Sequence, residues 1–106
     1  MDLAVAIYDL SRDWPTDERY GLTSQARRAV VSVAANIAEG YGRESPGSYV
    51  NFLKMAQGSL KELETHILLA QRLGIVEDVA TKACIDQCAS VGKLLRALMR
   101  SIPPKE

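Results

Sequence analysis

The sequence is poor in the residues that metal and redox chemistry use most. Its 106 residues include two cysteines and one histidine, and aromatic residues make up 6% of the chain. So few ligands and nucleophiles exclude most metal-dependent and nucleophilic mechanisms. The scarcity of aromatic residues also means that small aliphatic side chains must build the core.

Long hydrophobic runs are absent as well. The sequence has no uninterrupted apolar run of eighteen residues, and Met1–Leu10 lack the pattern of a signal peptide. We therefore expect neither a membrane protein nor a secreted one, and a length of 106 residues fits one domain over residues 1–106. The sequence predicts a soluble, cytoplasmic domain.

Net charge is absent too, because thirteen basic residues balance thirteen acidic ones. Charge is nevertheless unevenly distributed, with net values of −4 over residues 1–18, +4 over 19–61, −3 over 62–86 and +3 over 87–106. These blocks favour an anionic partner only if the fold brings the two basic ones onto one surface.

Helical spacing dominates the chain. Ser45 and Pro46 are typical of a helix start, and Gly74 is typical of a helix end. Between them, apolar residues recur at intervals of three and four, at Leu53, Ala56, Leu60, Leu63, Ile67 and Ala70.

Three further segments have the same periodicity, and no segment alternates as a strand would. The second begins after a capping Thr23 or Ser24 and ends at Gly40, and Pro103 and Pro104 end the last one. Their apolar positions are Leu3, Ile7 and Leu10; Ala26, Val30, Val33 and Ile37; and Cys84, Cys88, Val91, Leu95, Leu98 and Ile102.

The predicted fold class is therefore all-α. Short connections over residues 14–22, 41–45 and 74–77 favour an antiparallel up-down-up-down four-helix bundle. The first helix is much shorter than the third, so part of the apolar surface of the third lacks a cover, which favours homo-oligomerisation. The alternative is that the second and fourth helices cover it.

Several blocks of sequence resemble a known family. They are ERYGLTSQARRA (residues 18–29), NIAEG (36–40) and GSLKELET (58–65), followed by Leu73 and Gly74. In this order they resemble the four-helix-bundle proteins encoded within intervening sequences of bacterial 23S rRNA genes. The similarity extends from about Leu3 to Leu98.

This resemblance implies an antiparallel four-helix bundle that assembles into a homopentameric ring. It also implies kinship with the accessory variability protein of diversity-generating retroelements, which binds nucleic acid and a reverse transcriptase. Members of the family usually have a longer first helix than this chain.

Polar residues of the same blocks are candidates for a structural network. Asn36 and Glu39 lie in an otherwise apolar helix, where burial without partners is costly. Glu39 also lies near the negative end of the helix dipole, so it needs a partner, with Arg19, Arg28 and Arg43 as candidates. We expect a network that includes Glu18, Arg19, Asn36 and Glu39, the alternative for Glu39 being a binding or catalytic carboxylate. We expect Gly58 and Ser59 to allow close approach of two helices.

Catalytic and metal sites lack their usual residues. A di-iron bundle needs two Glu-x-x-His motifs, whereas His66 is the only histidine and shares a face only with Glu62. Cys84 and Cys88 lie one turn apart on the apolar seam, where they pack as small hydrophobic residues. No nucleophile elbow or phosphate-binding loop is present. The sequence predicts no enzyme, no metal and no cofactor.

Basic residues are the remaining functional candidates. Lys93, Arg96 and Arg100 are spaced by three and four residues along the last helix. Their place near the C-terminus of that helix also explains them, because cations are favourable there. With few aromatic residues for stacking, we expect contacts to the backbone of RNA or DNA. A scaffold that binds another protein is the alternative partner class. The candidate nucleic-acid-binding residues are Arg27, Arg28, Arg43, Lys54 and Lys61.

Overall fold

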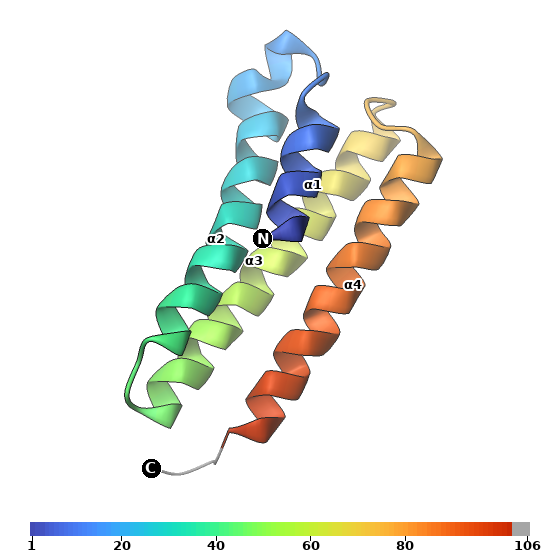
Figure 1. Ribbon diagram of the computed structural model, residues 1–106. Coiled ribbons are helices and arrows are strands. Elements are labelled where there is room, and N and C mark those ends of the chain that lie inside the picture. Colours follow the sequence, from blue (N-terminus) through green and yellow to red (C-terminus); the bar gives the residue numbers. More distant parts are fainter. Residues whose placement is uncertain (103–106) are drawn as a thin grey trace.

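The chain folds into four helices, of which successive ones run in opposite directions (Figure 1). The structure is a computed structural model that describes residues 1–102, apart from the side chain of Arg19. No strand occurs among these residues, so the predicted all-α four-helix bundle is confirmed. The helices are α1 (Asp2–Ser11), α2 (Ser24–Tyr41), α3 (Pro46–Arg72) and α4 (Asp78–Ser101).

The longest helix, α3, begins and ends where its sequence predicts. The backbone amide of Ser48 donates to Ser45 Oγ at 3.1 Å, which caps the first turn. After Arg72 the chain reverses at Gly74, whose φ of 77° is in the left-handed region that glycine adopts without strain. All six residues of the predicted seam, from Leu53 to Ala70, are buried.

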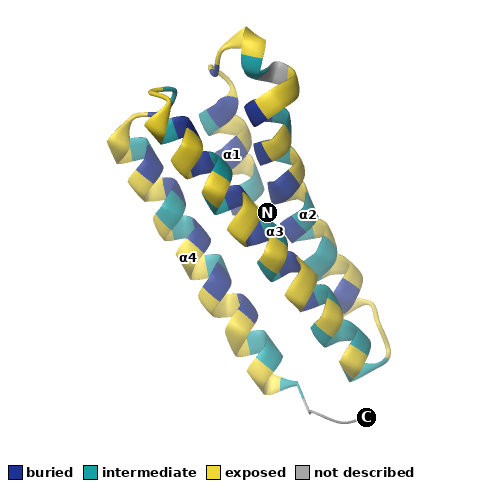
Figure 2. Ribbon diagram, turned by 180° about the vertical axis from the view of Figure 1, so that it is seen from behind, coloured by how far each residue is buried: buried dark blue, intermediate teal, exposed yellow. Residues whose placement is uncertain are grey.

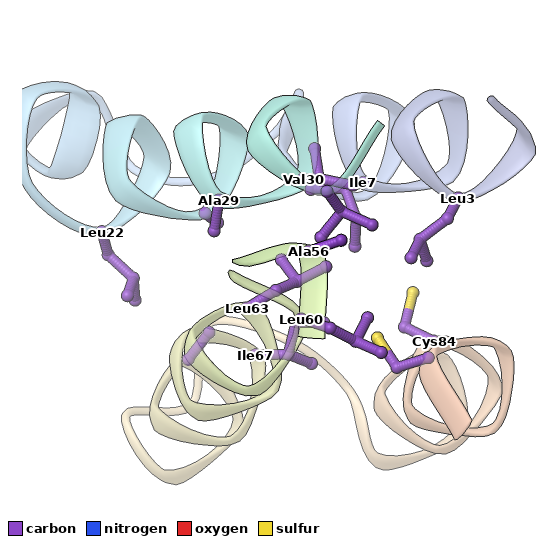
Figure 3. Packing of buried hydrophobic residues seen from close by; sticks show 14 of the residues in the cluster. Leu3, Ile7, Leu22, Ala29, Val30, Ala56, Leu60, Leu63, Ile67 and Cys84 are labelled. Carbon is purple, nitrogen blue, oxygen red and sulfur yellow. The ribbon is translucent and has the colours of Figure 1, made fainter. Parts of the chain in front are cut away.

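The core lies where the apolar seams of all four helices meet. Figure 3 shows Ile7 of α1 and Val30 of α2 pointing toward Leu63 and Ile67 of α3, with Cys84 of α4 at the side. The expected stripes are buried at most positions, while Leu10, Ile37, Val91, Leu98 and Ile102 are only half-buried.

Small residues bring α2 and α3 close together. Ser32 Oγ and Ser59 Oγ are 2.7 Å apart across the two helices. At Gly40 a side chain would have no room, because a Cβ atom there would lie 2.8 Å from Phe52 Cβ. Gly58, by contrast, faces open space and allows no close contact. The predicted close approach therefore involves Ser59 and Gly40.

Helix α2 begins where expected, with Thr23 at the N-cap position, but no side-chain capping bond forms there. Two short turns precede it, η1 (Thr16–Glu18) and η2 (Arg19–Thr23), and the backbone departs from helical geometry at Gly21. The amide of Leu22 donates to Glu18 Oε1 at 3.2 Å, while Thr23 makes no side-chain capping bond. Glu18 thus holds the turn that leads into α2.

The bundle has two unlike halves. Because α1 has 10 residues and α3 has 27, α1 lies beside only one half of the others (Figures 1 and 2). We call residues 1–33 and 62–88 the closed half, where α1 is present. Residues 34–61 and 89–102 form the open half, where only three helices pack. Pro103 and Pro104, predicted to end α4, lie outside the described residues.

Candidate nucleic-acid interface

The five candidate basic residues lie in three different places. Arg27 and Arg28 are near the start of α2 in the closed half, and Arg43 follows the end of α2. Lys54 and Lys61 are seven residues apart on α3, which places them two turns apart on one face. The structure therefore does not join all five into one surface.

Arg27 is bound to α1. Its Nε donates to Ser11 Oγ at 2.8 Å, its Nη2 donates to the Tyr8 carbonyl at 3.4 Å, and its guanidinium lies 4.7 Å from the centre of the Tyr8 ring. The cation thus reaches the negative end of the α1 dipole, where it is favourable. Arg28, the next residue, is exposed and forms no ion pair with a described residue.

Arg43 is held at the corner between α2 and α3. Its Nη2 lies 3.0 Å from Glu39 Oε2, and its guanidinium lies 4.7 Å from the centre of the Phe52 ring. Both contacts are at the surface, since the Glu39 side chain is 58% exposed. Arg43 is thus the partner of Glu39 among the three arginines considered.

The groove between α3 and α4 brings cations of both helices together. A cavity of about 280 Å³ is lined by Lys61 from α3 and by Lys93 and Arg96 from α4. Gly92 of α4 is buried beneath them, and a Cβ atom there would lie 3.4 Å from Leu60. The absence of a side chain at Gly92 lets α4 approach α3 with its cations at the rim.

These cations belong to a larger patch with little opposing charge. Neither residues 46–61 nor residues 87–102 contain an Asp or Glu. Glu64 is the one acid among the described lining residues, and its Oε1 lies 3.4 Å from Lys61 Nζ. We call the patch the basic face, and its residues are Lys54, Lys61, Lys93, Arg96 and Arg100.

The basic face includes three residues that the choice of candidates omitted. The spacing of Lys93, Arg96 and Arg100 was visible in the sequence, but their place near a helix C-terminus explained it equally well. What the sequence could not show is that α4 places Lys93 and Arg96 opposite Lys61.

The expected polar network is present only in part. Asn36 Nδ2 donates to the Ser32 carbonyl at 2.9 Å and contacts Ser32 Oγ at 3.1 Å, which in turn bonds Ser59. Glu18 makes its own bond, to the amide of Leu22. Glu39 lies apart at the surface with Arg43, because it is on the outer side of the last turn of α2. The side chain of Arg19 lies outside the described part of the structure.

Both cysteines are buried and free. Burial raises the pKa of the Cys84 thiol. Burial, with smaller effects of the Glu64 charge and of Cys84, raises the pKa of Cys88 to about 12. Since the thiolate is the reactive form, neither residue is a nucleophile at neutral pH.

Metal-binding clusters and membrane-spanning helices are both absent from residues 1–102. No group of three or more His, Cys, Asp or Glu residues within that range could hold a metal ion. No helix within it is long and apolar enough to cross a membrane.

An apolar groove extends from the N-terminus of α1 along α2 and α4. Its volume is about 420 Å³, and Val33 and Ile37 of α2 face Val91 and Leu94 of α4 across it. Leu94 is 55% exposed, and so is available to a partner. The short first helix was predicted to leave part of the apolar surface of the third helix uncovered. The groove lies instead between α2 and α4, while the seam of α3 from Leu53 to Ala70 is buried because α3 packs against both of them.

Comparison with known proteins identifies the family. Residues 1–97 match the family described as 23S rRNA-intervening sequence protein, which covers most of the chain. The chain belongs to this family. A comparison with curated proteins gives no match.

A solved structure supports the fold of this 23S rRNA-intervening sequence family member. It is a Bacteroides thetaiotaomicron protein described as having unknown function and as belonging to the S23 ribosomal protein family. The TM-score is 0.84 at 21% sequence identity, and 94% of each chain is covered. The likeness shows that the four-helix arrangement is shared over nearly the full length of both chains.

Proposed function

We propose that this chain is a non-enzymatic, homo-oligomeric protein that binds the phosphate backbone of RNA or DNA through the basic face. The observation that carries the proposal is the groove that joins Lys61, Lys93 and Arg96, in helical segments without an acidic residue. Membership of a family named for 23S rRNA intervening sequences is consistent with a nucleic-acid partner.

The electrostatics of the groove favour an anionic partner. Lys93, Arg96 and Arg100 form no ion pair with a described residue, so their charges are available. Binding phosphates would release counterions, and each contact adds to the salt dependence of affinity. In a ring of identical subunits the basic face would be repeated, which multiplies the number of phosphates contacted.

Fluorescence anisotropy with a labelled RNA hairpin, at low and high salt, tests this proposal. The variant Lys61→Gln/Lys93→Gln/Arg96→Gln should bind more weakly and lower the slope of log K against log salt by about 3. The matched control, Arg12→Gln/Arg72→Gln/Lys82→Gln, removes three exposed cations from the closed half and should bind as the wild type does. An equal loss of RNA affinity in both variants, or no binding by the wild type at low salt, would refute the proposal that RNA binds through the basic face.

The apolar groove supports the homo-oligomeric part of the proposal. A second copy of the chain would cover Leu94 and its neighbours on α2, and a pentamer is the assembly expected from the family resemblance. A scaffold that uses this groove for a different protein is the second candidate function.

Light scattering after size exclusion separates these cases. The wild type should have the mass of several chains, each of 11.6 kDa. Leu94→Glu should reduce the mass to that of one chain, whereas Val79→Glu, an equally drastic change at an exposed residue outside the groove, should not. A wild type that stays monomeric at micromolar concentration would contradict self-association and favour the scaffold.

A further inference from the structure

A second pocket lies in the closed half, away from the basic face. It forms where α1, η2 and the first turns of α2 meet, and its volume is about 630 Å³. Two aromatic rings, two guanidinium groups and three serine or threonine hydroxyls line it, together with Val31. We call it the tyrosine–arginine pocket, and its polar and aromatic residues are Tyr8, Tyr20, Thr23, Ser24, Arg27, Arg28 and Ser32.

One cation of the pocket is fixed in place. Arg27 stacks on Tyr8 and donates to Ser11 Oγ and to the Tyr8 carbonyl. A guanidinium has five N–H donors, so most of the Arg27 donors remain free after these two bonds. A cation whose position is already fixed loses little side-chain entropy when it binds an anion.

Three further groups of the pocket have no competing side-chain partner among the described residues, whereas the Ser32 hydroxyl is already bonded to Ser59 and Asn36. Tyr20 is 87% exposed on the η2 turn, which Glu18 holds through the amide of Leu22. Arg28 is exposed without an ion pair. Thr23 is 8% exposed, yet its hydroxyl makes no capping bond and the residue lines the pocket.

We infer that the tyrosine–arginine pocket binds one unpaired nucleotide of a single-stranded segment. The base would stack on Tyr20, the adjoining phosphates would contact Arg27 and Arg28, and the Thr23 hydroxyl would bond a sugar or phosphate oxygen. An aromatic ring beside guanidinium groups is the combination with which proteins bind unstacked bases. This inference rests on the proposed function and names the form of nucleic acid that each surface takes.

The basic face and the tyrosine–arginine pocket differ in aromatic content, so each suits a different form of nucleic acid. The described part of α4 has no aromatic residue, and Lys54 and Lys61 lie on the flank of α3 that faces α4, away from Phe52. The basic face can therefore contact only a phosphate backbone, which suits a duplex. The tyrosine–arginine pocket adds a stacking surface, which a paired base cannot use.

Anisotropy with two probes tests the inference, using a labelled oligouridine strand and a labelled RNA duplex of the same length. Tyr20→Ala should weaken binding of the single strand about five-fold or more and leave duplex binding unchanged. The control is Tyr41→Ala, which removes another exposed tyrosine at the opposite end of α2 and should change neither affinity. Competition with uridine monophosphate shows whether the pocket prefers a free nucleotide or a strand. We expect uridine monophosphate to displace the labelled strand only at a far higher concentration than an unlabelled strand needs.

Each outcome decides between the surfaces. If Tyr20→Ala has no effect, or if Tyr41→Ala causes an equal loss, the pocket is not a nucleotide site, while duplex binding still supports the basic face. If uridine monophosphate competes as well as the strand does, the pocket is a free-nucleotide site and the inference is wrong. If the wild type binds neither probe, the pocket and the proposed function both fail. Melting temperatures equal to that of the wild type would show that Tyr20→Ala acts on binding alone.

Discussion

The closed and open halves of the bundle differ in both packing and charge. In the closed half α1 completes the bundle with Leu3 and Ile7, and ten acidic residues outnumber six basic ones. In the open half only three helices pack, and six basic residues outnumber two acidic ones; the apolar groove spans the border between the halves, from Leu3 to Leu94. The two halves therefore offer different surfaces to a partner, which are the basic face in the open half and the tyrosine–arginine pocket in the closed half. The half that lacks a helix has uncovered apolar surface and unpaired cations, which are the features that a partner can use.

The contact at Gly40 is the strongest test of this comparison, because it shows whether the open half is tightly packed anywhere. In Gly40→Ala the new Cβ would meet Phe52 Cβ at 2.8 Å and Tyr49 Cδ1 at 3.0 Å, so α2 and α3 must separate. We expect a loss of about 1–3 kcal/mol in the free energy of unfolding, measured with urea.

Gly58→Ala is the matched control, because open space surrounds Gly58 on the exposed side of α3. Alanine has the higher helix propensity, so this variant should gain about 0.5–1 kcal/mol. Equal stability of Gly40→Ala and the wild type would mean that the open half is loosely packed throughout.

Arg27 tests how the closed half holds its short helix. Arg27→Ala removes a charged hydrogen bond to buried Ser11 and the contact with Tyr8. We expect a loss of about 1–2 kcal/mol by urea unfolding. Arg28→Ala, which removes the same charge without these contacts, should stay within about 0.5 kcal/mol of the wild type. If both variants unfold alike, Arg27 does not anchor α1.

The pH dependence of stability distinguishes the buried seam from the surface. The pKa of Cys88 is raised from 9.0 to about 12, so the folded state keeps the thiol protonated where the unfolded state loses the proton. The stability linked to this group is complete below pH 9 and is lost as the pH rises toward 12.

Urea unfolding of the wild type and of Cys88→Ala at pH 8 and pH 10 measures this effect. The stability advantage of the wild type should be smaller at pH 10 than at pH 8, by about 1 kcal/mol. In native buffer at pH 8 both thiols should react slowly with Ellman's reagent, and rapidly in urea. Rapid reaction of the native protein would contradict burial of Cys84 and Cys88.

The local parts of this fold could be predicted from the sequence, and the parts that join distant segments could not. Helical spacing predicted that the seam from Leu53 to Ala70 is buried, and short-range capping located Ser45 and Gly74. Such features depend on neighbours within a few residues along the chain. The position at which α2 starts was predicted, but the bond that holds the preceding turn was not, because Glu18 supplies it to Leu22 from outside that helix.

In the candidate site, too, local features could be predicted from the sequence and contacts between distant segments could not. Lys61 was identified from its stripe on α3, but its meeting with Lys93 and Arg96 depends on how α4 packs. Arg27 could be identified as an unexpected cation near a helix start, yet its role at the end of α1 is a tertiary contact. Trp14, one of the few aromatic residues that could stack on a base, is only 8% exposed and thus cannot do so. Tertiary packing decides which of several similar side chains remain free to bind.

Glu39 gives the smallest expected effect and tests whether the surface of the open half contributes to stability at all. An exposed ion pair such as that between Glu39 and Arg43 is worth at most about 1 kcal/mol. Removing a carboxylate from the last turn of α2 also relieves its repulsion with the helix dipole, by about 0.3–1 kcal/mol. The two effects oppose each other, so Glu39→Gln should stay within about 0.5 kcal/mol of the wild type in urea and should not change RNA affinity. Arg43→Ala should cost more, because it also loses the contact with Phe52. A drop in RNA affinity or in oligomer mass for Glu39→Gln, at unchanged stability, would instead make this carboxylate a binding residue.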